Sequence, residues 1–180
     1  MAGQAVQPAL RTLHKLYRVN TVNADQLDTL DTRLLLLLAA EPRLGVLECS
    51  RRLGVARGTT QARLDRLQRT GVIRGFGPDV DPVALGYAVT AFATLQIRQG
   101  RGAGVAGRLA GIPEVIEVHT ITGDADLLAR LVARSNADLQ RVIDEVVADD
   151  DIVRTSTYIA LSVHIPYRTR PLLERLLADA

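Results

Sequence analysis

Residues 57–69 combine arginine and threonine with small residues, and this combination suits contact with a nucleic acid. If the stretch is helical, its polar side presents basic and hydroxyl groups with little bulk between them. A guanidinium can donate two hydrogen bonds to guanine in the major groove of DNA, and a threonine methyl can contact thymine. On a helical wheel Thr60 also lies with Leu64 and Leu67 on the core side. The candidate base contacts are Arg57, Thr59, Thr60, Arg63 and Arg66.

Further arginines flank this stretch and are better placed for the DNA backbone. Arg51, Arg52 and Arg74 are the candidates for phosphate contacts, which contribute affinity without reading sequence. The alternative for them is an ordinary solvated surface. For Arg63 the alternative is a structural role in which it clamps the turn before its helix.

A second polar group surrounds a glycine in the back half of the chain. Carboxylates can pair with the ammonium group of a zwitterion, while backbone amides and hydroxyls can meet its carboxylate. The pattern therefore predicts a site for a small zwitterion, with a plain β-turn as the alternative because Gly-Asp is common turn chemistry. The candidate effector-binding residues are Thr122, Gly123, Asp124, Asp126 and Ser156.

Catalytic and metal-binding patterns are not evident. His14, His119 and His164 are far apart in the sequence, and none forms an i, i+4 pair with another. The Asp149–Asp151 run falls between an expected helix and an expected strand, which is typical of a solvated turn. We therefore expect no catalytic site, no metal and no cofactor.

The charge of the chain is uneven although its net charge is only +2. Residues 1–80 carry a formal charge of +5 and residues 81–180 carry −3, so the front half is the candidate for binding a polyanion.

The single cysteine excludes an internal disulfide and suits a reducing compartment. No apolar run approaches the roughly 20 residues that span a bilayer, and the first residues do not resemble a signal peptide. We expect a cytoplasmic protein with no membrane partner.

Three helices are expected in the front half. Leucines recur at three- and four-residue steps from residue 25 until Pro42 ends the helix. A second helix covers 46–53 and stops at Gly54, whose freedom at positive φ suits a tight turn. A third covers 57–69. This order predicts a helix-turn-helix.

Periodicity changes after residue 87 and predicts an α+β domain. The first strand alternates partly and is rich in β-compatible residues, and the second helix carries its apolar residues on one side. The order β-α-β-β-α-β is that of a ferredoxin-like domain, with both helices packed on one face of an antiparallel sheet. The expected elements are strands at 88–98, 115–122, 127–133 and 152–164, and helices at 104–111 and 137–148.

The open face of such a sheet needs a partner. Even its less apolar side carries Phe92 between threonines, so we expect homo-dimers to form through sheet faces. The expected divisions are an N-terminal extension at 1–24, a DNA-binding domain at 25–76, a linker at 77–87, a ligand-sensing and oligomerising domain at 88–165 and a tail helix at 166–180. The extension is either a short amphipathic helix or a frayed end. The tail helix either caps the dimer interface or packs on its own subunit.

Four stretches of residues 27–164 together resemble the Lrp/AsnC, or leucine-responsive, family of transcriptional regulators. The resemblance implies a winged helix-turn-helix that binds operator DNA as a dimer, a tetramer or an octamer, and a ligand domain that responds to an amino acid or related metabolite. The stretches are Leu27–Asp31, Leu53–Val55 with Arg63–Leu67, Gly71–Phe76 with Asp81-Pro82 and Leu85–Tyr87, and Val115–Leu128.

Two residues depart from the family pattern. Ala56 stands where a serine usually caps the recognition helix, so either Thr59 or Thr60 caps a shorter helix or the end frays. Ala125 stands where an aromatic is common.

Two other functions stay open. One is an enzyme similar to sirohaem decarboxylases, for which His119 with Arg130 or Arg154 would have to bind a tetrapyrrole. The other is an architectural DNA-binding protein without an effector.

Overall fold

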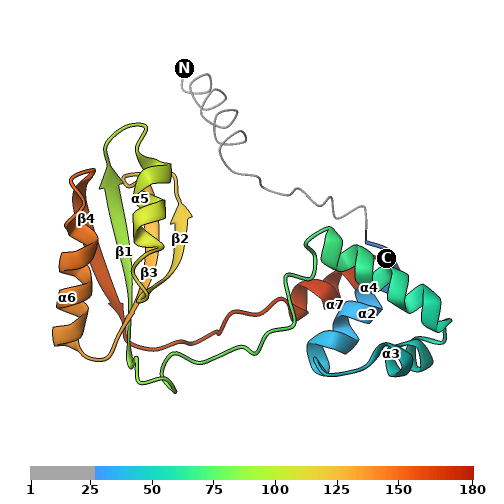
Figure 1. The fold of residues 1–180 in the computed structure, drawn as a ribbon. Coiled ribbons are helices and arrows are strands. Elements are labelled where there is room, and N and C mark those ends of the chain that lie inside the picture. Colours follow the sequence, from blue (N-terminus) through green and yellow to red (C-terminus); the bar gives the residue numbers. More distant parts are fainter. Residues whose placement is uncertain (1–26) are drawn as a thin grey trace. The chain divides into compact units, whose positions relative to one another are not determined.

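The computed structural model describes residues 27–180, so the predicted extension at 1–24 lies outside the described residues. Figure 1 shows the described chain as two compact units. One unit contains the chain from residue 27 to Gly77 together with Tyr167–Ala180, and the other contains Pro78–Pro166. The front unit is therefore built from both ends of the described chain.

Three helices form the predicted helix-turn-helix, which is confirmed: α2 (Thr29–Ala40), α3 (Val46–Leu53) and α4 (Arg57–Arg69). The turn between α3 and α4 depends on Gly54, which has a left-handed φ of 69°. Its amide donates to the Arg51 carbonyl, and the Val55 amide donates to the Ser50 carbonyl. A side chain at position 54 would be strained at this φ, so glycine fixes the angle at which α4 leaves α3.

The leucine pattern of α2 buries one side of that helix against α3 and α4. Leu34, Cys49 and Leu67 are each at most 2% exposed and form the centre of this core. Asp28 caps α2 by accepting a hydrogen bond from the Asp31 amide, while the Asp31 side chain accepts one from the Asp28 amide. This reciprocal capping box satisfies two amides at the helix start.

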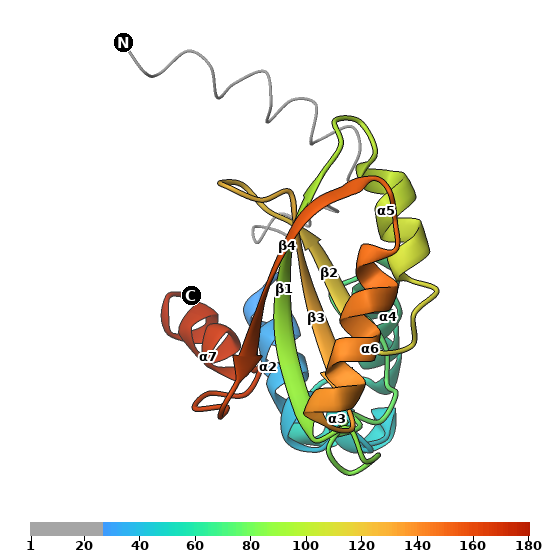
Figure 2. The same cartoon turned by 90° about the vertical axis from the view of Figure 1, so that its left-hand side faces the viewer.

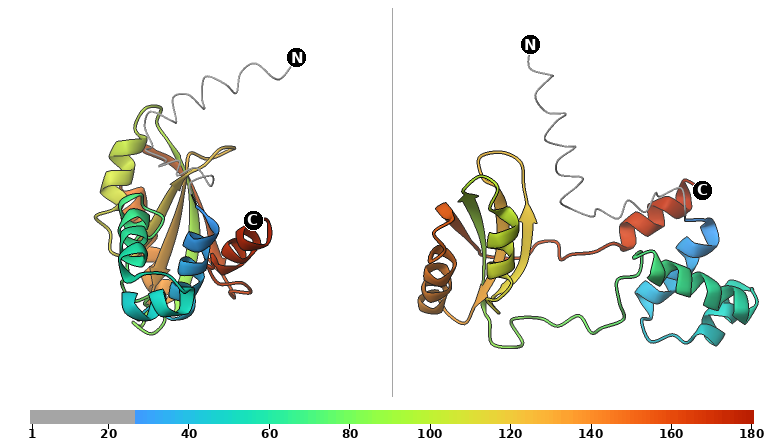
Figure 3. Two further views of the ribbon diagram at one scale, coloured as in Figure 1. Left: turned by 90° about the vertical axis from the view of Figure 1, so that its right-hand side faces the viewer. Right: turned by 45° about the horizontal axis from the view of Figure 1, so that its top comes forward.

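The tail helix α7 (Arg170–Ala178) belongs to the front unit and packs against α2. Figure 3 shows α7, in red, beside α2, in blue, in both of its views. Leu173 and Leu177 are the half-buried residues of α7, whereas Leu172 is 63% exposed. Of the two placements that the sequence left open, the structure has the tail helix packed on its own subunit.

The back unit is a four-stranded antiparallel sheet with two helices, which confirms the predicted β-α-β-β-α-β order. The strand order is β2-β3-β1-β4, so the first and third strands of the sequence are central. The elements are β1 (Val89–Ile97), α5 (Gly102–Leu109), β2 (Val115–Thr120), β3 (Leu127–Ala133), α6 (Asn136–Val147) and β4 (Ile152–Ala160).

Both helices cover the same face of the sheet (Figure 2). Alternate residues of β1 and β3 point to that face, and small residues there let the helices approach closely. The fully buried core includes Ala91, Ala93, Leu95, Val105, Ala129, Leu131 and Val142. The other face of the sheet has no helix on it, and Phe92 and Tyr158 lie on it as register partners.

Two strands end earlier than the sequence predicts. β4 ends at Ala160 and not at residue 164, and β2 ends at Thr120 and not at residue 122. Ala160 is opposite Thr90, near the first residue of β1. Residues beyond it keep an alternating pattern, but they have no neighbouring strand to bond with, so the ladder stops.

Candidate DNA-binding surface and effector pocket

The recognition helix α4 begins at Arg57 without a side-chain cap. Ala56 is its N-cap residue, and the Thr60 hydroxyl donates back to the Ala56 carbonyl instead of capping a shorter helix. The first amides of α4 therefore have no side-chain acceptor and are open to an anion. Arg57 and Thr59 are exposed, but Thr60 is only 1% exposed, as part of the core side of the helix.

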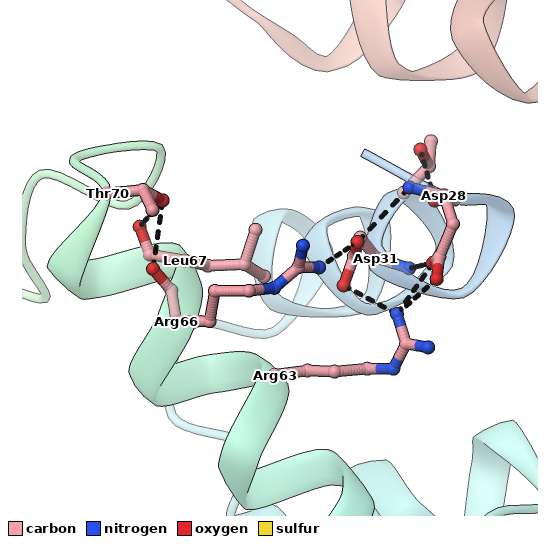
Figure 4. Close-up of polar contacts among 7 residues, drawn as sticks. Asp28, Asp31, Arg63, Arg66, Leu67 and Thr70 are labelled. Carbon is pink, nitrogen blue, oxygen red and sulfur yellow. Dashed lines mark hydrogen bonds and ion pairs between the residues drawn. The ribbon is translucent and has the colours of Figure 1, made fainter. Parts of the chain in front are cut away.

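Arg63 and Arg66 form ion pairs with two aspartates of α2 (Figure 4). Arg63 Nη1 lies 2.7 and 2.6 Å from the two carboxylate oxygens of Asp28 and 2.9 Å from Oδ1 of Asp31. Arg66 Nη2 donates to Oδ2 of Asp31. The Asp31 side chain is fully buried, so its charge is compensated by two guanidiniums from a different helix.

The ion pairs shift the pKa values of two of these residues. Partial burial alone would raise the pKa of Asp28, but hydrogen bonds from Arg63 and from the Asp31 amide outweigh it and lower this pKa. The hydrogen bond to Asp28 raises the pKa of Arg63 despite some desolvation. Both groups are therefore more firmly charged than in the unfolded chain, and the α2–α4 contact is ionic at neutral pH.

The flanking arginines also have protein partners. Arg52 pairs with Glu41 and, at 3.0 Å, with Glu48, and Arg51 pairs with Glu48 at 3.5 Å. The hydrogen bond from Arg52 lowers the pKa of Glu41. These pairs are at least one-third exposed, so each is weak and can exchange for a phosphate.

A groove of about 460 Å³ runs along the outer side of α4. It is lined by Asp28, Thr59, Ala62, Arg63 and Arg66. The structure thus brings three of the predicted base contacts together, leaves Arg57 exposed beyond them and buries Thr60. The sequence analysis missed Asp28 and Asp31 as part of this surface. Their spacing is that of a capping box, but the burial of Asp31 depends on which helix packs beside it.

A pocket of about 350 Å³ opens on the helix-free face of the back unit. Its walls carry one cation, one carboxylate, hydroxyls and an amide, which is a donor and acceptor set suited to a zwitterion. The Gln96 amide donates to the Asp124 carbonyl, and the Thr94 hydroxyl lies 3.4 Å from the Ser156 carbonyl. The lining residues are Thr94, Gln96, Ile121, Asp124, Ala125, Arg154, Ser156 and Tyr158.

Two of the five predicted effector residues, Asp124 and Ser156, line this pocket. Thr122, Gly123 and Asp126 are not among its lining residues. Asp126 instead ties the β2–β3 turn to β1, because its carboxylate accepts from the Ile97 amide at 2.8 Å and its own amide donates to the Leu95 carbonyl. Gly123 has a φ of 116°, so it serves the backbone of that turn.

Most of the remaining pocket residues come from two neighbouring strands. Thr94 is opposite Ser156, and Gln96 is opposite Arg154, so the pairs share one face. The alternation of polar residues along β1 and β4 was visible in the sequence, but their register was not. Ala125 also lines the pocket, so this departure from the family pattern falls on the pocket wall.

Comparison with known proteins assigns both units. Residues 27–74 match a winged helix-turn-helix DNA-binding domain, and residues 90–170 match the Lrp/AsnC ligand binding domain. The HTH-type transcriptional regulator FL11 of Pyrococcus furiosus is 33% identical over 128 residues, which cover 71% of this chain and 85% of that relative. The chain belongs to the Lrp/AsnC family of transcriptional regulators.

Solved structures of transcriptional regulators share this fold. Escherichia coli AsnC superposes with a TM-score of 0.75 at 28% identity, over 81% of this chain and 99% of AsnC. A transcriptional regulator of Neisseria meningitidis in complex with L-Met superposes with a TM-score of 0.71 at 23% identity, over 81% of this chain and 96% of that chain. As an Lrp/AsnC protein, the chain is a DNA-binding transcriptional regulator with a ligand-binding domain.

Between residues 27 and 180, no helix is both long and apolar enough to cross a membrane. In the same part of the chain, no three His, Cys, Asp or Glu side chains are grouped so that they could hold a metal ion.

Proposed function

We propose that this Lrp/AsnC regulator binds operator DNA as a dimer or higher oligomer through the exposed side of α4, and that an amino acid in the sheet-face pocket controls this binding. The observation that carries the proposal is the outer side of α4. The side chain of Arg57 makes no hydrogen bond or ion pair with any described residue. Arg57 stands with Thr59 at the uncapped start of the helix. A regulator that binds operator DNA in this way would work in the cytoplasm.

The geometry divides the candidate DNA contacts into two groups. Arg57 and Thr59 are free to meet base edges, and Ala62 gives the helix a narrow side that can enter a groove about 12 Å wide. Arg63 and Arg66 border the same groove but already compensate the charge of Asp31. They therefore shape the surface more than they supply its phosphate contacts, for which Arg51, Arg52 and Arg74 are the candidates.

Dimerisation through the open sheet face would supply the second recognition helix. Phe92 is 37% and Tyr158 62% exposed there, and the two are register partners. Arg130, the partner of Phe92 on the other side, has a buried Nε without a hydrogen-bond acceptor among the described residues. The exposed aromatic side chains on this face favour its burial against a second copy.

The pocket walls favour an amino acid as the controlling ligand. Arg154 is exposed and has no ion-pair partner among the described residues, so it can bind a carboxylate, while Asp124 can bind an ammonium group. Tyr158 provides an apolar ring for the ligand side chain. Because Tyr158 also lies on the proposed dimer face, ligand binding and assembly would share a residue.

The test is a binding selection on genomic fragments with the purified full chain, followed by fluorescence anisotropy on the selected site and on a scrambled duplex. Two recognition helices of a dimer should require half-sites about one turn of DNA apart, roughly 34–36 Å. Moving the half-sites by half a turn should abolish tight binding, and moving them by a whole turn should restore part of it. A protein that stays monomeric and ignores DNA at low salt would refute the proposal.

Control by an amino acid is tested in the same assay. Each of the twenty amino acids is added to the protein–operator complex, and the oligomeric state is followed by light scattering. We expect at least one to change operator affinity or assembly. If none does and none shifts the melting temperature, control by an amino acid is refuted, and the effector-independent DNA-binding protein becomes the favoured alternative.

A further inference from the structure

Asp28 and Asp31 bring two carboxylates to the side of α4 that should face a polyanion. The groove along α4 is lined by Asp28 as well as by Thr59, Ala62, Arg63 and Arg66. A negative charge at such a place repels phosphate, so it needs a reason other than affinity. Figure 4 shows where each carboxylate points: both accept hydrogen bonds from the guanidiniums of α4.

The two aspartates differ in how readily they can release a paired arginine side chain. The Asp31 side chain is fully buried and pairs with both arginines. Arg66 therefore still compensates its charge when Arg63 turns away, whereas the loss of both cations would be strongly unfavourable. The Asp28 side chain is 54% exposed and holds Arg63 from the solvent side through both of its oxygens. Asp31 thus keeps Arg66 at the contact between the two helices, whereas Asp28 is the solvent-side partner that holds the Arg63 guanidinium in place.

We infer that Asp28 is a specificity-determining positioning residue, which withholds the Arg63 guanidinium from the phosphates of DNA that lacks the operator sequence. This inference rests on the proposed function of α4. Binding to arbitrary DNA depends almost entirely on phosphate contacts, and the protein can take whichever orientation gives the most of them. In the operator complex, base contacts fix the orientation of α4, so a freed Arg63 gains less there.

Asp28→Asn tests the inference without removing the helix cap. Asparagine caps helices as well as aspartate does, so the bond from the Asp31 amide is kept. Arg63 loses the carboxylate that holds it on the solvent side and keeps only its pair with Asp31. We expect tighter binding to a scrambled duplex, and a plot of log K against log salt that is steeper by about 0.9, as for one added phosphate contact. The ratio of operator to scrambled affinity should fall.

Asp65→Asn is the matched control. It makes the same change in charge on α4 itself, but the Asp65 carboxylate accepts from Gln61 at 2.7 Å and pairs with no arginine among the described residues. It should leave the salt slope on scrambled DNA unchanged. In the double variant Asp28→Asn/Arg63→Gln, the slope gained from Asp28→Asn should disappear, since the released guanidinium is gone.

Each result decides the inference. If Asp28→Asn and Asp65→Asn change the slope equally, or the gain persists in the double variant, overall charge and not Arg63 is responsible and the inference is wrong. If the parent protein discriminates its operator but Asp28→Asn keeps the full ratio, the inference fails while the proposed function stands. If the parent protein binds no DNA, both fail.

Discussion

Arg74 donates a hydrogen bond to the Tyr167 hydroxyl, with 3.2 Å between Nη2 and the phenol oxygen. The guanidinium also lies over the tyrosine ring, 6.0 Å from its centroid. Arg74 follows the recognition helix, and Tyr167 follows the ligand-binding domain. The tail therefore contacts the DNA-binding unit twice, at Arg74 and through the packing of α7 on α2.

Replacing the inner leucines of α7 should destabilise the DNA-binding unit. Leu173 and Leu177 are half-buried, so the double change to alanine should lower the free energy of unfolding by about 2 kcal/mol, below the usual cost for two fully buried leucines. Urea unfolding followed by far-ultraviolet circular dichroism measures this change. Leu172→Ala, on the exposed side of the same helix, is the control. Equal effects would show that α7 does not pack as described.

Arg57→Ala should weaken operator binding without unfolding the protein. A bidentate arginine–guanine contact contributes about 1–3 kcal/mol, so we expect roughly a 5- to 150-fold loss of affinity. Anisotropy on the operator and on a scrambled duplex separates base reading from phosphate binding. Arg33→Ala removes an exposed arginine of α2 and should have a much smaller effect. If Arg57→Ala keeps full operator affinity, Arg57 does not read the site.

Arg154→Ala should abolish or weaken binding of an amino acid in the sheet-face pocket. The loss of one charge-assisted hydrogen bond, about 1.5–3 kcal/mol, corresponds to roughly a 10- to 150-fold weaker complex. Isothermal titration calorimetry measures the dissociation constant of the ligand that the thermal-shift assay has identified. Arg98→Ala changes another exposed arginine of the same unit, outside the pocket, and serves as the matched control. Unchanged ligand affinity in Arg154→Ala would show that the amino acid binds outside this pocket.

Placing a charge at Phe92 should break the dimer. Phe92→Arg puts a cation beside Arg130 on the open sheet face, where the two residues are register partners, so burial of this face becomes unfavourable. Light scattering should show a smaller species and anisotropy a weaker operator complex. Val147→Arg changes an exposed apolar residue on the helix-covered side and should leave assembly intact. A dimer that survives Phe92→Arg would place the interface on another surface.

The α2–α4 contact should weaken in acid. The pKa of Asp28 is lower in the folded protein than in the unfolded chain, so its contribution to stability is complete above the unfolded pKa and is lost as the pH falls through the folded one. The window therefore lies below about pH 4. Urea midpoints between pH 6 and pH 2.5 should fall less steeply for Asp28→Asn than for the parent protein. Parallel curves would mean that Asp28 does not titrate with folding.

The sequence predicted those helices whose ends are set by residues close to them in the chain. Gly54 marks the end of α3 because a left-handed turn is a property of one residue, and the predicted bounds of α3 and α4 agree with the structure. The end of β4 was placed too late because alternation continues past Ala160. A strand ends where its partner ends, and no local pattern carries that information.

The two candidate sites show the same limit more strongly. Arg63 and Arg66 were predicted to be base contacts, with a structural role for Arg63 as the alternative, because the sequence does not show that α2 puts a buried carboxylate beside both. Arg154 and Tyr158 enter the pocket only through the register of β4 against β1. Side chains that act together across elements become visible only once packing and register are known.

The ligand-binding domain is inserted between two segments of the DNA-binding unit, because α7 returns to α2 after β4 has ended. The chain thus crosses between the two units twice, once at residue 78 and once at residue 166. A protease that cuts only the first connection would yield two fragments that remain associated under native conditions. They would separate only when α7 is also pulled away from α2.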